Sequence, residues 1–241
     1  MHKTRPAPRY RHEQKYEINA AGYYPLRQKL KVFMIPDSHS DKNGRYMITS
    51  LYFDNCFDKA LAEKIAGVSQ REKFRFRYYG NDTDLIFLEK KQKINGLCLK
   101  TSVPVSHEQC QSIIDGRWQH LAHNSPPLLA ELVFKMNTQL LRPRTVVRYW
   151  REAYTYEPGN VRITFDSSIS TGLRPETFFE STTVLPATRT TGSMDKHGAF
   201  STCILEVKYD DFMPSLIKDL IEPHCTKVQA FSKYAQCRNI I

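Results

Sequence analysis

The sequence predicts a protein of the α+β class, mainly β, built as an eight-stranded antiparallel β-barrel tunnel with a charged interior and flanking helices. Two observations predict this fold. About eight segments alternate polar and apolar residues with the period of a strand, and nearly every one carries its charges on one face. Turn-forming residues separate most of these segments, which favours antiparallel neighbours. Closing the sheet would remove its exposed edges and place the charged faces inside.

The expected elements follow each other along the whole chain, 1–241, which is long enough for a single domain with its own core. Alternation predicts strands at 8–18, 46–54, 72–79, 84–93, 97–104, 145–156, 160–167 and 202–210. Tight turns are expected at GND (80–82), ING (94–96) and EPGN (157–160). Helical periodicity predicts helices at 20–33, 57–65, 107–121, 127–141 and 213–222. Because 167–200 is rich in Ser, Thr and Gly, a long mobile loop is expected there.

The segment REKFRFRYYG, residues 71–80, has the most regular charge pattern. Its basic positions alternate with aromatic ones: Arg71, Lys73, Arg75 and Arg77 against Phe74, Phe76 and Tyr78. One strand of this kind is usually a solvated surface, but repetition of the pattern on other strands favours a shared interior. Cations crowded in a partly desolvated space repel each other unless carboxylates or a bound anion neutralise them. The interior is therefore predicted to bind a polyanion, and the Arg fork suits phosphate oxygens.

The remaining strands are interpreted in the same way, face by face. The charged faces expected to point inward hold Arg9, Arg11, Glu13, Lys15 and Glu17, then Glu89, Lys91 and Lys93, then Cys98, Lys100 and Ser102, then Arg148, Trp150 and Glu152, then Arg162, Thr164 and Asp166, and finally Glu206, Lys208 and Asp210. The opposite faces are apolar and aromatic, so the predicted helices are expected to cover them.

Overall charge agrees with an anionic partner. Lys and Arg number 35 against 25 Asp and Glu, a formal net charge of +10. Nucleic acid, a phosphate compound or a membrane surface would each suit such a balance. The six cysteines form no CxxC or CxH pattern, which argues against a structural zinc site and for reduced thiols in a cytosolic protein. Neither a signal peptide nor a membrane span is expected.

Several of these segments, taken in order, are similar to a known family. They are RHEQKYEI, SLYFDN, REKFRFRYYG, IFLEKKQKINGLCLKTSVPV, TVVRYWREAY, VRITFD, ILEVKYDD and FSKYAQCR, and together they cover most of the chain. The chain resembles the triphosphate tunnel metalloenzymes, and among them the polyphosphate polymerase domain of the vacuolar transporter chaperone (VTC) type in its stand-alone bacterial form. The resemblance implies a phosphotransferase that adds the γ-phosphate of ATP to a growing polyphosphate chain, with Mn²⁺ or Mg²⁺ as cofactor.

The resemblance also implies roles for individual residues. Catalysis would involve Lys15, Arg75, Arg77, Lys91, Lys100, Arg148, Arg162 and Lys233, and phosphate binding would add Arg11 and Lys208. Glu206 matches the metal-binding glutamate of the last strand, although a Glu-x-Lys pair also fits plain cross-strand ion pairing. The sequence departs from the family pattern at two positions, and both changes reduce the number of acidic residues. Arg11 replaces the first Glu of a Glu-x-Glu-x-Lys opening, and Lys208 replaces a second carboxylate on the last strand. A single metal ion is therefore expected.

Three functions stay open at this point. ATP-dependent polyphosphate synthesis is preferred, and a metal-dependent triphosphate, polyphosphate or nucleoside triphosphate hydrolase of the same fold comes second. Third is a non-catalytic polyanion or nucleic-acid-binding module, which would place its aromatic residues beside its cations rather than opposite them. The expected partners are ATP and inorganic polyphosphate, with no nucleic acid. A cytoplasmic location is expected, at the periphery of the inner membrane if the protein joins a membrane complex.

Overall fold

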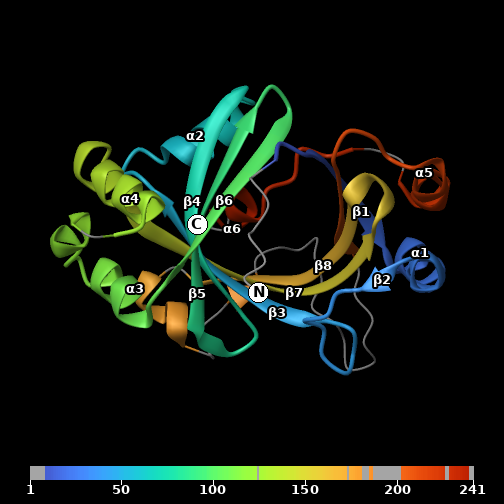
Figure 1. Ribbon diagram of the computed structural model, residues 1–241, viewed down its shortest axis with the longest axis horizontal. Coiled ribbons are helices and arrows are strands. Elements are labelled where there is room, and N and C mark those ends of the chain that lie inside the picture. Colours follow the sequence, from blue (N-terminus) through green and yellow to red (C-terminus); the bar gives the residue numbers. More distant parts are fainter. Residues whose placement is uncertain are drawn as a thin grey trace, which may run out of the picture.

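The body of the protein is one curved antiparallel β-sheet (Figure 1). The computed structural model describes residues 9–123, 125–172, 174–180, 185–186, 202–225 and 228–238. Eight strands form the main path of the sheet, in the order β1-β10-β8-β7-β3-β4-β5-β6, and two short strands pair with β7 and β8. Every strand pair is antiparallel. The prediction of a mainly β fold with flanking helices is confirmed.

The main strands coincide with the eight predicted ones. They are His12–Asn19 (β1), Tyr46–Asp54 (β3), Gln70–Tyr79 (β4), Asp82–Ile94 (β5), Leu97–Val105 (β6), Arg142–Tyr156 (β7), Val161–Gly172 (β8) and Thr202–Tyr209 (β10), with the short Ile35–Pro36 (β2) and Leu185–Pro186 (β9). The hairpin turns expected after β4 and β5 are present, because Gly80 and Gly96 take the positive φ angles that these turns require.

The α-helices are Ala20–Phe33 (α1), Lys59–Ile65 (α2), His107–Ile114 (α3), Pro127–Thr138 (α4), Ser215–Ile221 (α5) and Lys233–Arg238 (α6), with short 3₁₀ helices at Gln119–Ala122, Pro158–Asn160, Pro175–Phe179 and Glu222–His224. The helix expected at 107–121 ends at Ile114 because Gly116 turns the chain with a φ of 80°. Among the described residues, no helix is both long and apolar enough to span a lipid bilayer.

The predicted barrel does not close with a full ladder, which corrects the expectation from sequence. The edge strands β1 and β6 meet only at one bridge, where Arg11 and Cys98 exchange two backbone hydrogen bonds of 2.9 Å. The physical reason is the twist of the sheet, because it carries β4, β5 and β6 steeply across the direction of β7 and β8 (Figure 1). The sheet is therefore a tunnel whose two edges touch rather than a continuous barrel.

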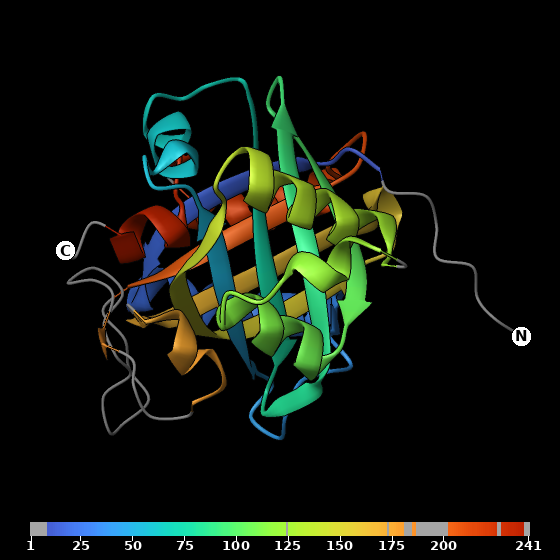
Figure 2. The ribbon, with the colours of Figure 1, turned by 90° about the vertical axis from the view of Figure 1, so that its left-hand side faces the viewer.

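Helices cover the outer face of the sheet in two groups. On one side α3 and α4 lie across the strands (Figure 2). Phe76 of β4 and Leu88 of β5 belong to the same core as Leu132 of α4. On the other side α1 and α5 cover β1, β8 and β10, with Leu26 and Leu205 in the same core. These apolar faces are the ones predicted to point outward, so the charged faces point into the tunnel.

The predicted loop at 167–200 begins later than expected. β8 continues to Gly172, and Pro175–Phe179 forms a 3₁₀ helix whose Phe178 is completely buried in the outer core. Thr171 pairs with Val147 of β7, so a stretch rich in Ser and Thr extends the ladder here. The rest of the predicted loop, apart from β9, lies outside the described residues.

Candidate functional site

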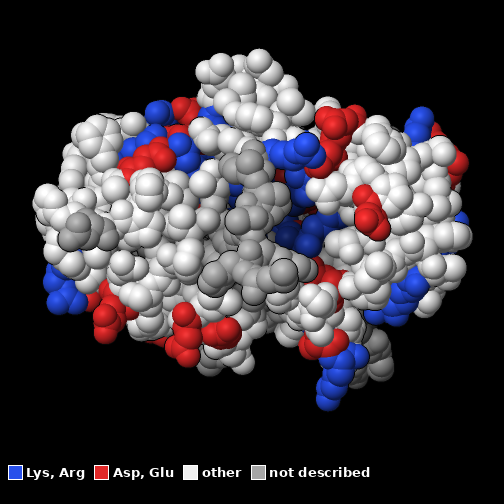
Figure 3. Space-filling view, in the orientation of Figure 1, with Lys and Arg blue, Asp and Glu red and all other residues white. Residues whose placement is uncertain are grey.

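The inner face of the sheet carries a dense network of charged side chains. Basic residues line the hollow at the centre of the molecule (Figure 3). They come from most of the main strands and from α6: Lys15, Lys73, Arg75, Arg77, Lys91, Lys100, Arg151, Arg162, Lys208 and Lys233. The acidic residues among them are Glu13, Glu89, Asp166 and Glu206. Every second side chain of a strand points to the same face, which explains why the network follows the strands.

Glu89 is the acidic centre of the β4–β5–β6 side. Its carboxylate accepts hydrogen bonds from Arg75 Nε at 2.8 Å, Arg75 Nη2 at 2.6 Å and Lys100 Nζ at 2.9 Å. Arg77 Nη1 lies 3.7 Å away. Burial alone would raise the pKa of Glu89, but Arg75, Arg77 and Lys100 hold it well below its usual range. Glu89 is therefore ionised at neutral pH and offsets only one of three positive charges.

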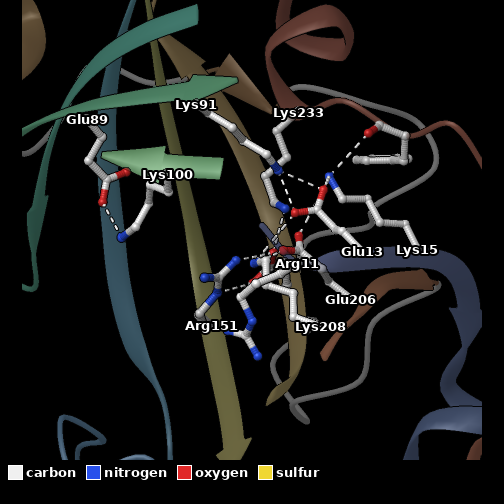
Figure 4. A network of polar contacts seen from close by, with 12 residues as sticks. Arg11, Glu13, Lys15, Glu89, Lys91, Lys100, Arg151, Glu206, Lys208 and Lys233 are labelled. Atoms are coloured by element: carbon white, nitrogen blue, oxygen red, sulfur yellow. Dashed lines mark hydrogen bonds and ion pairs between the residues drawn. The ribbon is translucent and has the colours of Figure 1, made fainter. Parts of the chain in front are cut away.

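Glu13 and Glu206 form a second acidic centre where β1 meets β10 (Figure 4). Lys15 Nζ lies 3.3 Å from Glu13 and 3.6 Å from Glu206, and Lys91 Nζ lies 2.5 Å from Glu13. Lys208 Nζ contacts Glu206 directly. Burial would raise the pKa of Glu206, but Lys208 and Lys15 hold it well below its usual range. Both carboxylates are thus held by lysines on the inner face of the sheet.

Asp166 of β8 connects the tunnel to the C-terminal helix. It is fully buried and accepts a bidentate pair from Arg151, with contacts of 2.6 Å and 2.7 Å. Lys233 Nζ of α6 lies 2.5 Å from the same carboxylate and 4.7 Å from the centre of the Tyr149 ring. Burial would raise the pKa of Asp166, but Arg151 and Lys233 lower it to about 2. Asp166 therefore orients two cations toward the interior.

Comparison with known proteins shows which family the chain belongs to. The family model described as the VTC domain matches residues 10–241. The chain belongs to the VTC domain family. No protein of curated function shows significant similarity to it.

Solved structures share the fold of this VTC domain at low sequence identity. A candidate adenylyl cyclase from Hippeastrum, described as having a dominant triphosphatase activity, is 14% identical with a TM-score of 0.57, and the match covers 95% of each chain. A candidate adenylate cyclase from Bacillus halodurans is 9% identical with a TM-score of 0.52, and the match covers 92% of this chain and 95% of the other. The predicted resemblance to the VTC type is confirmed by the family match, and these solved structures share its fold.

Most of the predicted site residues meet on the inner face of the VTC domain. They are Lys15, Arg75, Arg77, Lys91, Lys100, Arg162, Glu206, Lys208 and Lys233. Arg162 lies at one end of the tunnel, where Nη2 is 2.5 Å from Asp37 and 3.0 Å from Tyr46 Oη. Arg11 lies at the start of β1, 2.8 Å from Asp210. Their roles in binding and catalysis stay predictions.

Arg148 is the exception, because its predicted inward position is wrong. Its Nε donates to Thr49 Oγ1 at 3.2 Å and its Nη2 to the Glu180 carbonyl at 2.7 Å, both on the outer face. Trp150 and Glu152 share that face, and Glu152 pairs with Arg27 of α1 at 2.6 Å. The segment RYWREAY has charges on both faces, so alternation alone did not decide which face is inner. The structure brings Arg151 inside instead, a residue that sequence reasoning missed.

Lys73 is a second inner residue to which the resemblance assigned no role. Its Nζ lies 5.2 Å from the centre of the Tyr52 ring, and Arg75 Nη1 donates to Tyr52 Oη at 2.8 Å. No acidic side chain in the described part of the chain forms an ion pair with Lys73. Its alternation with Arg75 and Arg77 was the signal that could have identified it.

The donor set suits a metal ion that takes most of its ligands from a substrate. No cluster of three or more His, Cys, Asp or Glu side chains able to hold an ion occurs in the described parts of the chain. Glu13 and Glu206 nevertheless approach the same Lys15 Nζ, at 3.3 Å and 3.6 Å. Two carboxylates leave several positions of a Mg²⁺ or Mn²⁺ shell for phosphate oxygens and water. Glu13 and Glu206 are thus the carboxylates that would hold such an ion, and a single metal ion stays a prediction.

Proposed function

We propose that this VTC domain is an ATP-dependent polyphosphate polymerase. The observation that carries the proposal is the length of the cationic lining. Arg71, Lys73, Arg75 and Arg77 share one face of β4. Alternate residues of a strand are about 7 Å apart, so these four cations span roughly 20 Å. Cations on the facing strands add to them, and one triphosphate does not require a lining of this extent.

The chemistry asks the protein for alignment and charge neutralisation. The terminal oxygen of an acceptor chain attacks the γ-phosphorus of ATP, and the bond from that phosphorus to the β-phosphate oxygen breaks in line, so that ADP leaves with the electron pair. Arg75 and Arg77 would neutralise the equatorial oxygens, and Lys15 and Lys91 would hold the acceptor. A divalent metal ion held by Glu206 and Glu13 would supply further charge neutralisation at the phosphates.

A triphosphate hydrolase is the second candidate, because the similar Hippeastrum protein is described as a triphosphatase. Hydrolysis requires a base that activates water, and a base works best when its pKa is near the operating pH. Despite burial, the pKa values of Glu89 and Glu206 are held far below their usual range by neighbouring cations. Weakly basic carboxylates favour an acceptor that is already anionic, such as a phosphate chain.

The test is the product formed from ATP. Purified protein given ATP, Mn²⁺ or Mg²⁺ and a short phosphate primer should release ADP and produce a ladder of lengthened chains on a gel. The matched control is the same mixture without primer, in which the ladder should appear later or not at all. Orthophosphate rising in step with ADP, with no ladder, would assign the protein to the hydrolases.

Phosphate binding is expected to weaken as the pH rises above about 7. Burial, with repulsion from Lys91, Lys15 and Arg75, lowers the pKa of Lys73 to about 7 despite the opposing effect of Tyr52. Lys73 is thus charged in the free protein below that pH and largely neutral above it. Because a bound phosphate stabilises the ammonium form, binding above pH 7 should take up a proton.

Calorimetry in buffers with different ionisation enthalpies measures this uptake. The matched control is Lys73→Arg, which keeps its charge over the whole range and should lose both the proton uptake and the part of the pH dependence that comes from Lys73. Equal proton uptake by the two proteins above pH 7 would exclude Lys73 as the source.

A further inference from the structure

The inner face of β8 carries a buried hydroxyl group without a partner in the described part of the chain. Thr164 is 1% exposed, and its Oγ1 forms no hydrogen bond with any described residue. It alternates with Arg162 and Asp166 on the inner face, while Ile163 and Phe165 point into the outer core. Burying an unpaired hydroxyl costs free energy that a valine of the same shape would not cost. Such a group points to a ligand-bound state in which it has a partner.

The register of the sheet shows which side chains lie beside this hydroxyl. Thr164 is directly opposite Glu206 of β10 on one side and Ala153 of β7 on the other. Residues directly opposite each other on one face have Cβ atoms about 5 Å apart. Ala153 offers only a methyl group. Glu206 is therefore the polar side chain that faces Thr164 across the strands.

The inner neighbours of Thr164 along β8 do not supply a free acceptor. Arg162 carries only N–H donors, so it cannot accept the hydroxyl proton. Both oxygens of Asp166 already accept hydrogen bonds from Arg151. This leaves Glu206 as the acceptor opposite the hydroxyl.

In the structure both oxygens of Glu206 are engaged by lysines (Figure 4). Lys208 Nζ contacts Oε1, and Lys15 Nζ lies 3.6 Å from Oε2. A divalent cation bound to Glu206 would compete with these ammonium groups for the same carboxylate. Carboxylates that hold a metal ion are themselves hydrogen-bonded by neighbouring groups, which fixes their orientation. A hydroxyl beside Glu206 is suited to that task.

We propose that Thr164 is a positioning residue for Glu206, to whose carboxylate its hydroxyl donates a hydrogen bond when that carboxylate holds a divalent metal ion. This inference rests on the proposed function, in which Glu206 is a metal ligand. The hydrogen bond replaces part of the contact that Glu206 loses with Lys208. It also gives the Thr164 hydroxyl the partner that it lacks in the metal-free protein.

The experiment compares valine replacements at two buried threonines. Thr145→Val is the matched control, because Thr145 of β7 is also buried with an unpaired hydroxyl but lies opposite Tyr52 instead of an acid. Calorimetry measures the affinity of each variant for tripolyphosphate with a chelator and for the Mn²⁺–tripolyphosphate complex. We expect Thr164→Val to bind the Mn²⁺ complex about tenfold more weakly and metal-free tripolyphosphate as the wild type does. Thr164→Ser, which keeps the hydroxyl, should restore the affinity for the Mn²⁺ complex, and Thr145→Val should match the wild type in both titrations.

Thermal denaturation without metal separates this role from a structural one. The melting temperature of Thr164→Val should equal or exceed that of the wild type, because the valine removes an unpaired buried hydroxyl. A clear decrease would show that the hydroxyl already has a partner in the metal-free fold, and would overturn the proposal. Wild-type affinity of Thr164→Val for the Mn²⁺ complex, or an equal loss in Thr145→Val, would also overturn it. The titrations contain neither ATP nor primer, so they decide the role of Thr164 even if the wild type makes no polymer and the polymerase function fails.

Discussion

In a variant carrying Arg75→Met together with Glu89→Gln, ATP turnover should fall by about 10³-fold, the loss typical of removing an arginine that stabilises phosphoryl transfer. The affinity for tripolyphosphate should fall by about tenfold to a hundredfold, as expected for loss of a charge-assisted contact. Arg75 donates two hydrogen bonds to Glu89, so the double replacement removes a cation and its partner at once. The double replacement leaves the net charge of the tunnel unchanged. A loss of binding therefore cannot be attributed to a change in net charge.

The single variant Arg75→Met is expected to behave differently. Judged from sequence, removing one of several crowded cations would relieve repulsion and keep or raise the melting temperature. In the structure, Glu89 is 2% exposed and would lose its two shortest contacts. Leaving a buried carboxylate short of partners is costly, so the melting temperature of the single variant should fall below that of the double variant.

Arg148→Met is the matched control, because it replaces the same residue type on the outer face of the sheet. Its melting temperature should decrease, while its affinity for tripolyphosphate should equal that of the wild type. The measurements are calorimetric titration and thermal denaturation. Unchanged affinity in the double variant, or a loss in Arg148→Met as large as in the double variant, would contradict the tunnel assignment.

For Glu206→Gln, metal-dependent turnover should fall by about 10³-fold, since metal ions supply several kcal/mol of charge stabilisation in such reactions. The amide keeps the shape of the side chain and loses the charge that would hold the ion. Lys208 and Lys15 would lose an anionic neighbour, so metal-free polyphosphate should bind with equal or higher affinity. Activity and metal-free binding should therefore change in opposite directions.

Turnover measured against Mn²⁺ concentration, together with calorimetry in the presence of a chelator, checks this expectation. Glu131→Gln provides the matched control, because Glu131 of α4 pairs with Lys90 and Lys135 and is not among the residues that line the cavity around Lys15 and Lys91. Normal turnover of Glu206→Gln at limiting Mn²⁺ would remove the metal role from Glu206. A parallel loss of polyphosphate affinity would instead indicate a damaged tunnel.

The inner positions were predictable where one face of a strand carries a run of apolar residues. In β4, Phe74 and Phe76 can only face the helices, so Arg75 and Arg77 face the tunnel. In β7 both faces carry charge, and the choice between Arg148 and Arg151 depends on which neighbouring residues they pack against. The Glu180 carbonyl on one side and Asp166 of β8 on the other decide it, and both lie outside β7, so the sequence of β7 alone does not show them.

The position of helix α6 also depends on tertiary contacts that the sequence alone does not show. Its six residues are too few for helical periodicity, and its place was implied only by resemblance. It is held by tertiary contacts, with Tyr234 Oη donating to Asp54 at 2.7 Å and Arg238 donating to Asp58 at 2.7 Å. Asp54 also accepts the backbone N–H groups of Ala60 and Leu61, which ties α6 to α2 and positions Lys233 over the tunnel.

The sequence by itself determined the eight strands, the sign of the tunnel charge and most of the inner residues, because side chains alternate along a strand whatever surrounds it. The tertiary structure alone decided how far the sheet closes and which carboxylate neutralises which cation. These depend on twist, on register and on contacts such as Lys91 with Glu13, between strands far apart in the chain. Alternation within one strand carries no information about a partner on another strand. Such ion pairs form only when the twisted sheet brings the two strands close together.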